Sequence, residues 1–265
     1  MMGRGFVKVE GGQLYFEAAG AGPVVVLIHG FALDTRMWDD QWEALTPHYR
    51  VIRYDVRGFG QSSLPGAETF SHLEDLLALL QQLAATPAHL IGLSMGGGLA
   101  LDFALMYPAH VHSLILADST LSGFNWQKDW GEPFRAAKFF GLDAAKAAWL
   151  NDELFAPANT QPIVAARLQK MTETYSGHHW LQPVHTRGLE KPAIEQLENL
   201  RLPLLMVEGE RDLPDFRAIT HLLAERAPRA RLVTLPGVGH MVNMEAPAEF
   251  NRLALEFLAR FEPEA

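Results

Sequence analysis

Hydrophobic and polar residues follow two different periods along this chain. Residues 6–10 and 13–18 are short runs in which apolar and polar side chains alternate, and the glycines at positions 11 and 12 between them predict a β-hairpin. Residues 23–29, with the sequence PVVVLIH, form an unbroken apolar run. Such a run, rich in β-branched side chains, is typical of a strand that is buried on both faces of a parallel sheet.

Segments with a strand pattern and segments with a helix pattern alternate after that run. Further strands are predicted at residues 50–55, 89–94, 112–118, 203–209 and 230–235. Helices, whose apolar positions recur about every 3.6 residues, are predicted at residues 36–46, 70–85, 97–107, 216–227 and 247–261. Short strands separated by longer helices indicate βαβ units, so the fold class is α/β with a parallel sheet.

The alternation is interrupted between residues 121 and 199. This stretch has a helical pattern, is broken by several prolines, and holds four of the six tryptophans. We therefore expect a core domain made from residues 1–120 and 200–265, with a helical cap at residues 121–199 inserted between two strands.

Composition excludes several classes of partner and location. The formal net charge of −9 disfavours a nucleic-acid partner, because binding to phosphates depends largely on lysine and arginine. The first 20 residues lack the apolar core of a signal peptide, and no run of 18 apolar residues predicts a membrane span. The absence of cysteine excludes disulfides and fits a reducing compartment. We expect a cytoplasmic protein with no membrane partner.

Two further patterns resemble binding motifs but lack essential parts of them. The glycines at 96–98 have neither the spacing of a dinucleotide fingerprint nor the lysine of a phosphate-binding loop. His178, His179 and His185 are close in sequence but lack acidic ligands at helical spacing. We therefore expect no cofactor and no metal ion.

One polar residue, Ser94, interrupts an apolar run at the point where a predicted strand is followed by a predicted helix. The residues around it read GLSMG, from Gly92 to Gly96, and match the pattern G-x-S-x-G. In this nucleophile elbow, a tight turn from strand to helix lifts the serine hydroxyl above the sheet. The alternative is that Ser94 only caps the helix that follows it.

A serine nucleophile needs a base and a third group that orients the base. His240 lies in a glycine-rich loop just after the last predicted strand, and Asp212 follows the strand before it. Loops at the carboxyl edge of a parallel sheet are where ligands bind in such folds. Ser94, Asp212 and His240 are therefore candidates for one catalytic triad.

The motifs around these residues resemble those of a known family. They are HGF at residues 29–31, YDVRGFGQSS at 54–63, GLSMGG at 92–97, GERD at 209–212 and GVGH at 237–240. With these motifs, and with serine, aspartate and histidine in this order, nearly the whole chain resembles the α/β-hydrolase family. The resemblance implies a mostly parallel eight-stranded sheet, flanked by helices, with an inserted helical cap.

The resemblance also implies a role for each candidate residue. Ser94 would be the nucleophile, His240 the general base and then acid, and Asp212 the carboxylate that orients the imidazole. The backbone amides of Phe31 and Met95 would form the oxyanion hole, which stabilises the charge of the tetrahedral intermediate.

Asp118, at the end of the strand before the cap, is a second candidate for the acid.

Several reactions stay open within this family. Relatives that open epoxides or remove halides use an aspartate where this chain has Ser94, which disfavours those reactions. Carbon–carbon bond hydrolases typically carry a tryptophan directly after the catalytic histidine, where this chain has Met241.

We therefore expect a serine esterase for small to medium apolar or aromatic groups, acting as a monomer or homodimer on a small-molecule ester or lactone. The alternatives are an enol-lactonase-like lactonase, a carbon–carbon bond hydrolase of aromatic degradation and, from another class, a small-molecule receptor derived from a hydrolase.

Overall fold

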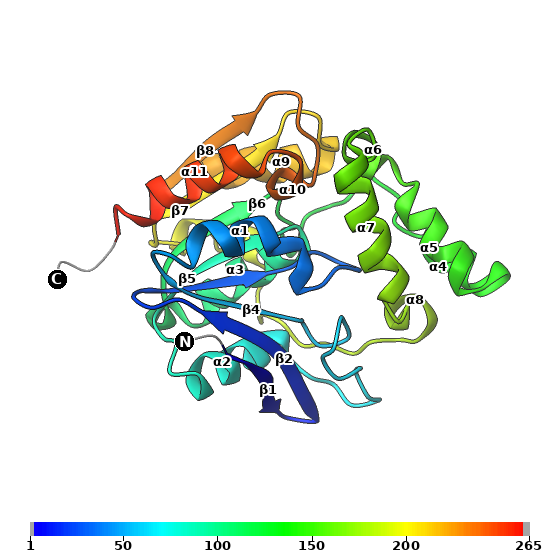
Figure 1. Cartoon of the computed structure of the whole chain (residues 1–265), viewed down its shortest axis with the longest axis horizontal. Helices are drawn as coiled ribbons and strands as arrows, with labels where there is room; N and C mark the ends of the chain where they lie inside the picture. The colour runs from blue at the N-terminus through cyan, green and yellow to red at the C-terminus, as the bar shows by residue number, and fades with distance from the viewer. Residues whose placement is uncertain (1–2, 262–265) are drawn as a thin grey trace.

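An eight-stranded sheet runs through the centre of the molecule (Figure 1), and the computed structural model describes residues 3–261. The strands are β1 (Gly3–Val9), β2 (Gly12–Ala19), β3 (Val24–Ile28), β4 (Arg50–Tyr54), β5 (Ala88–Leu93), β6 (Val111–Ala117), β7 (Leu204–Gly209) and β8 (Ala230–Leu235). Their spatial order is β1-β2-β4-β3-β5-β6-β7-β8. The pairs β1/β2 and β2/β4 are antiparallel and the other neighbours are parallel. The predicted fold class is confirmed.

Helices cover both faces of this sheet, since every residue of β5 and β7 is buried. The helices of the sheet region are η1 (Thr35–Trp38), α1 (Asp39–Leu45), α2 (His72–Gln82), α3 (Met95–Met106), η2 (Pro108–His110), α9 (Pro214–Arg226), α10 (Val242–Glu245) and α11 (Pro247–Leu258), where η denotes a 3₁₀ helix. Helix α1 packs against α11, and α2 packs against α3.

Local capping sets several helix boundaries that the apolar period does not. The predicted helix at residues 36–46 is divided into η1 and α1, and the Asp34 side chain caps η1 by accepting a hydrogen bond from the Arg36 amide (3.0 Å). Helix α2 begins at His72 because the Ser71 hydroxyl faces the Glu74 amide at 3.5 Å.

Between β6 and β7 the chain leaves the sheet and forms a group of helices, here called the inserted helical segment (residues 121–199). Figure 1 shows its main helices side by side at one side of the sheet, coloured green. They are α4 (Glu132–Phe140), α5 (Leu142–Leu150), η3 (Glu153–Phe155), α6 (Ala156–Asn159), α7 (Pro162–Thr174), α8 (His178–Leu181), η4 (Ala193–Glu195) and η5 (Leu197–Asn199).

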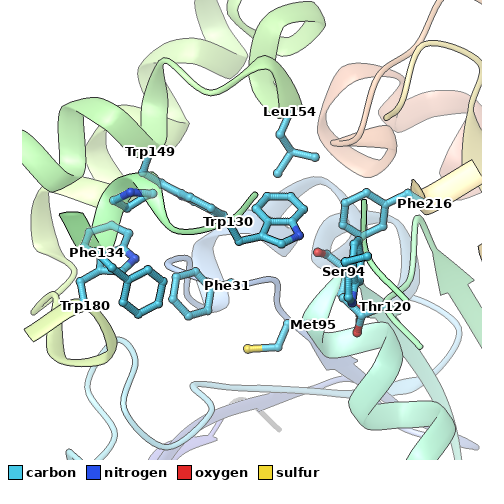
Figure 2. Close-up of a pocket in the computed structure, with 12 residues that line it drawn as sticks. Phe31, Ser94, Met95, Thr120, Trp130, Phe134, Trp149, Leu154, Trp180 and Phe216 are labelled. Atoms are coloured by element: carbon cyan, nitrogen blue, oxygen red, sulfur yellow. The ribbon is translucent and has the colours of Figure 1, made fainter. Parts of the chain in front are cut away.

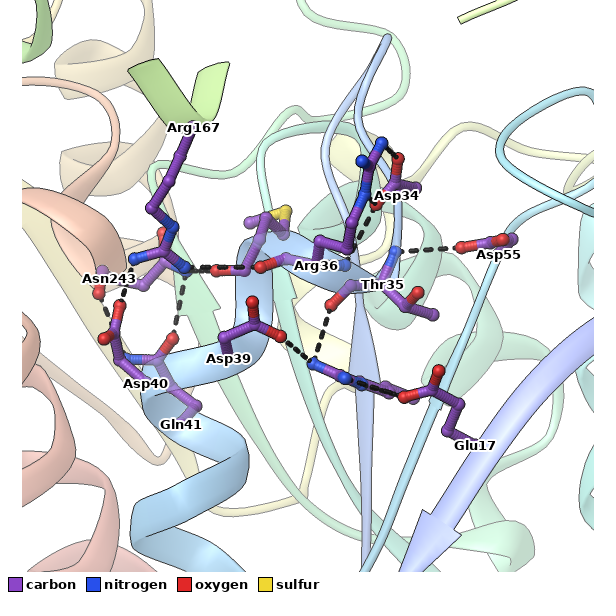
Figure 3. A network of polar contacts seen from close by, with 12 residues as sticks. Glu17, Asp34, Thr35, Arg36, Asp39, Asp40, Gln41, Asp55, Arg167 and Asn243 are labelled. Carbon is purple, nitrogen blue, oxygen red and sulfur yellow. Dashed lines mark hydrogen bonds and ion pairs between the residues drawn. The ribbon is translucent and has the colours of Figure 1, made fainter. Parts of the chain in front are cut away.

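Two arginines tie helix α7 to the first helices after β3 (Figure 3). Arg167 on α7 forms an ion pair with Asp40 on α1 at 2.5 Å, and it also donates to the carbonyl oxygen of Arg36 at 3.3 Å. Arg36 in turn donates to the hydroxyl of Thr174, at the end of α7, at 2.6 Å. These contacts join the inserted helical segment to the loop region that follows β3.

Helix α3 begins in direct contact with the backbone of β3 and β5. A Cβ atom added at Gly96 would lie 2.1 Å from the carbonyl oxygen of Ile28, and one added at Gly92 would lie 2.3 Å from the carbonyl oxygen of Gly96. No side chain fits at either position without displacing backbone. The two glycines of the G-x-S-x-G pattern are therefore required by packing.

We expect the variant Gly96→Ala to lower the free energy of unfolding by at least about 2 kcal/mol, because backbone rather than a flexible side chain blocks the added methyl group. Gly188→Ala is the matched control, since a Cβ there meets no atom within 4 Å, and it should change stability by less than about 0.5 kcal/mol. Urea denaturation of the three proteins measures both values. Equal stability of the two variants would contradict the close contact.

Candidate active site

Ser94 occupies the turn between β5 and α3 in a strained backbone conformation. Its φ is 54° and its ψ is −119°, a region that residues other than glycine rarely adopt. Backbone hydrogen bonds hold it there, from the Ser94 amide to the Ala117 carbonyl (2.9 Å) and from the Gly98 amide to the Ser94 carbonyl (3.0 Å). The Ser94 side chain makes no capping hydrogen bond to α3, a helix that the structure describes in full. The alternative role of helix cap is therefore wrong.

His240 and Asp212 form a buried pair beside this serine. His240 lies in the loop after β8 and Asp212 in the loop after β7, and His240 Nδ1 is 2.8 Å from Asp212 Oδ2. A neutral imidazole that donates from Nδ1 carries its lone pair at Nε2. Within residues 3–261, that Nε2 atom has no hydrogen-bond partner. His240 and Ser94 both line one small cavity, together with Phe31.

The two backbone amides expected to bind the oxyanion belong to Phe31 and Met95, which lie close to Ser94. Met95 is the first residue of α3, and amides in the first turn of a helix have no acceptor within that helix. Phe31 lies in the loop after β3, and it lines an apolar cavity together with Ser94 and Met95. The structure thus brings Phe31, Met95, Ser94 and His240 to one place, with Asp212 behind His240.

His29 holds the loop that carries Phe31, a role that the sequence did not reveal. Its imidazole is fully buried, its Nδ1 is 2.8 Å from the Gly30 carbonyl, and its Nε2 accepts a hydrogen bond from the Val56 amide at 2.9 Å. Burial lowers the pKa of His29, which keeps the ring neutral and able to accept at Nε2. The HGF motif quoted above contained this residue, but its contact with the loop after β4 is visible only in the fold.

An apolar cavity of about 310 Å³ opens in front of Ser94 (Figure 2). Its wall combines residues of the sheet region with all four tryptophans of the inserted helical segment. The lining residues are Phe31, Ser94, Met95, Thr120, Trp126, Trp130, Pro133, Phe134, Trp149, Leu154, Trp180 and Phe216. None of these described residues carries a charge. The cavity therefore suits an uncharged, apolar or aromatic group.

A second cavity of about 330 Å³ adjoins the first and is more polar. The two share Met95, Thr120 and Trp126, and the second is also lined by His72 and Asp102. Burial raises the pKa of Asp102 to about 6, although a hydrogen bond from the Ser122 hydroxyl at 3.0 Å opposes this. Burial lowers the pKa of His72 to about 3.

Of the three histidines at 178, 179 and 185, His179 is packed among aromatic side chains. The ring of His179 stacks on Phe59, with 4.4 Å between the ring centres, and its Nδ1 lies 2.8 Å from the Tyr175 hydroxyl. Among residues 3–261, the potential ligand atoms that gather within 4.8 Å of one another belong to Asp118, Asp212 and His240.

The comparison with known families agrees with this architecture. A sequence model described as the alpha/beta hydrolase fold matches residues 23–247. The chain belongs to the α/β-hydrolase family. This match confirms the resemblance carried by the five motifs.

Two curated relatives and one solved structure illustrate which α/β hydrolases are similar to this one. A pimeloyl-[acyl-carrier protein] methyl ester esterase of Yersinia enterocolitica is 29% identical, over 92% of this chain and 97% of that protein. A 3-oxoadipate enol-lactonase of Acinetobacter baylyi is 27% identical, over 89% of this chain and 88% of that protein. The crystal structure of a hydrolase from Pseudomonas aeruginosa is 30% identical with a TM-score of 0.81, and covers 96% of this chain and 98% of its own. The proteins similar to this chain thus include esterases and lactonases.

Within residues 3–261 of this α/β hydrolase, no helix has both the length and the apolar character needed to cross a membrane.

We expect the variant His72→Phe to be less sensitive to acid than the wild type. Because the pKa of His72 falls from 6.5 to about 3 on folding, only the unfolded chain takes up this proton below pH 6.5. The stability that the neutral ring contributes to the folded state is fully present above pH 6.5 and is lost as the pH falls towards 3. The free energy of unfolding of the wild type, relative to the variant, should fall by at most about 1.4 kcal/mol per pH unit. Urea titrations between pH 6.5 and 4 measure this difference, and parallel curves would contradict it.

Proposed function

We propose that this α/β hydrolase cleaves carboxylic esters that carry a neutral apolar or aromatic group, with Ser94 as the nucleophile. One observation carries the proposal: the strained Ser94 lies between an apolar cavity and a histidine whose other nitrogen is bonded to a buried aspartate. This is the arrangement in which a serine hydroxyl becomes a nucleophile. In this proposal the inserted helical segment is a cap over the site.

The first half of the reaction forms an acyl-enzyme. The Ser94 hydroxyl attacks the ester carbonyl carbon and gives its proton to Nε2 of His240, while Asp212 holds the imidazole at Nδ1. The negative charge that develops on the carbonyl oxygen is stabilised by the amides of Phe31 and Met95, and one such donor is typically worth about 3 kcal/mol. The imidazolium then protonates the leaving alkoxide, and the alcohol departs.

The second half releases the acid. A water molecule takes the position of the alcohol, gives its proton to Nε2 of His240 and attacks the acyl carbonyl carbon. The tetrahedral intermediate collapses, the imidazolium returns its proton to the Ser94 oxygen, and the carboxylic acid leaves. The enzyme ends in its starting state, so each turnover consumes one ester and one water.

The lining of the apolar cavity in front of Ser94 supports the preference for neutral substrates. Its tryptophans and phenylalanines offer apolar surface, and the described lining residues include no arginine or lysine that would pair with a substrate carboxylate. Burying an unpaired carboxylate costs several kcal/mol, because the charge loses its hydration. A substrate with a second, ionised carboxyl group therefore fits the cavity poorly.

We expect Ser94→Ala to lower kcat/KM for a p-nitrophenyl ester by at least about 10⁴-fold, because the acyl-enzyme is no longer formed. Ser119→Ala is a matched control, since Ser119 is also a buried serine near the end of a central strand, and its hydroxyl donates to the carbonyl oxygen of the neighbouring Thr120 at 2.8 Å. It should retain activity within about threefold of the wild type. A Ser94→Ala variant that keeps the wild-type rate on esters and lactones would refute the proposed function.

We expect a neutral aromatic ester to be hydrolysed at least about 100-fold faster, in kcat/KM, than a charged ester of similar length. Methyl 3-phenylpropanoate and the monoanion of monomethyl glutarate are a suitable pair, because they share the methyl ester and differ in the group that enters the cavity. Initial rates at pH 8 measure both. Equal rates, or a preference for the anion, would contradict the assignment of the aromatic cavity to a neutral group.

A further inference from the structure

A second buried aspartate, Asp118, lies beside the pair of Asp212 and His240 and has no part in the reaction described above. It follows β6, whose residue Ala117 pairs with Val207 of the parallel neighbour β7. Asp212 follows β7, so the two carboxyl groups come from the carboxyl ends of adjacent strands. Asp118 is 1% exposed.

The hydrogen bonds of the two carboxyl groups leave one buried oxygen atom without a donor. Asp212 accepts from His240 at one oxygen and from the Leu213 amide (2.7 Å) at the other. Asp118 Oδ1 accepts from the Gly209 amide at 3.1 Å. Asp118 Oδ2 is buried and has no hydrogen-bond donor within the described part of the chain. A buried carboxylate oxygen in this state is unfavourable, whereas a protonated one would itself be a donor.

An oxygen atom of the Asp118 carboxyl group lies within 4.8 Å of an oxygen atom of Asp212 and of a ring nitrogen of His240. Two adjacent carboxylates that are both ionised repel each other, and burial strengthens the repulsion. Two further acidic side chains interact electrostatically with this group: Glu208 on β7 with Asp118, and Glu245 on α10 with Asp212 and His240. Glu208 itself contacts His221 on α9 at 3.2 Å. Among these described neighbours there is no lysine or arginine to offset a second negative charge.

The backbone of Asp118 adopts a strained conformation. Its φ is +40°, in the left-handed region that favours glycine, and its amide donates to the Val207 carbonyl at 3.1 Å. Strained positions of this kind persist where the surrounding structure imposes them, and they are concentrated at functional sites.

We propose that Asp118 is a positioning residue that carries a proton on Oδ2 and donates it in a hydrogen bond to Asp212, so that the two carboxyl groups share one negative charge. The proposal rests on the proposed function, because it assigns Asp118 to the support of the residue that orients His240.

The physical consequence concerns the basicity of His240. A second negative charge at this distance would favour the imidazolium form and remove the free base that Ser94 needs. A neutral Asp118 avoids that charge, and its hydrogen bond still holds the carboxylate of Asp212 in position. The pKa of Asp118 is raised well above its usual range by burial and by the neighbouring Asp212, in agreement with this arrangement.

The variants Asp118→Asn and Asp118→Ala separate this role from simple space filling. Asparagine is neutral and keeps a donor towards Asp212, so we expect kcat/KM within about threefold of the wild type and an acid limb of the pH profile that moves by less than about 0.3 pH units. Alanine removes the donor and should lower kcat/KM at least about tenfold. If Asp118 is ionised in the wild type, asparagine removes a charge, and the acid limb moves to lower pH by more than about one unit. That shift would overturn the proposal, as would an asparagine variant as impaired as the alanine variant.

An infrared measurement tests the proton without any substrate. At pH 8, above the pKa of about 6 of Asp102, the wild type should show the carbonyl-stretching band of a buried protonated carboxyl group, and Asp118→Asn should lose it. Absence of the band from the wild type would overturn the proposal, and so would its persistence in the variant. The band does not depend on turnover, so it stays informative if Ser94→Ala shows that the proposed function is wrong.

Discussion

The start of helix α3 lies so close to strands β3 and β5 that backbone touches backbone, and the rest of the site is arranged around that contact. Because Gly92 and Gly96 carry no side chains, the strand and the helix approach each other more closely than residues with a Cβ atom would allow. The residue between them, Ser94, is left in a conformation that non-glycine residues avoid, and the backbone hydrogen bonds on both sides of it keep it there. The strain is thus balanced by the packing of a central parallel sheet.

A parallel sheet also explains why acidic groups gather in an uncharged interior. The strands β6, β7 and β8 all end at one edge, and the loops that follow them carry Asp118, Asp212 and His240. Burial disfavours each charge. Two carboxyl groups and one imidazole can therefore be buried side by side only if few of these groups are ionised. The same reasoning applies to His29, whose burial keeps the ring neutral and so preserves its acceptor for the Val56 amide. For His29 and Asp118, burial is the largest cause of the pKa shift.

The sequence allowed the parallel strands to be predicted almost residue by residue, because each is a short run rich in apolar residues between longer helix patterns. Helix boundaries were less accurate, since Asp34 and Ser71 act through side-chain hydrogen bonds that the apolar period does not record. The four-residue helix α10 was missed because it is too short to show a period. Ser94, Asp212 and His240 were chosen from motifs, and the structure places His240 Nδ1 2.8 Å from Asp212 and brings Ser94 and His240 to one cavity. The contact of Asp118 with Asp212 and the role of His29 depend on which strands are neighbours, and no local pattern contains that information.

Different parts of the chain supply the groups proposed to react and most of the cavity lining that would contact the substrate. The groups proposed to react belong to the sheet region, where glycine contacts and buried hydrogen bonds leave little freedom. Most of the apolar wall is formed by the inserted helical segment, which is joined to the sheet region through Arg167, Asp40 and Arg36. The Arg167–Asp40 ion pair is partly exposed, so it contributes little stability and the segment depends mainly on its aromatic packing. A change among its tryptophans would therefore alter the shape of the cavity while leaving the strained serine and its hydrogen bonds intact. Substrate preference in this fold can thus vary through one segment without altering the residues that react.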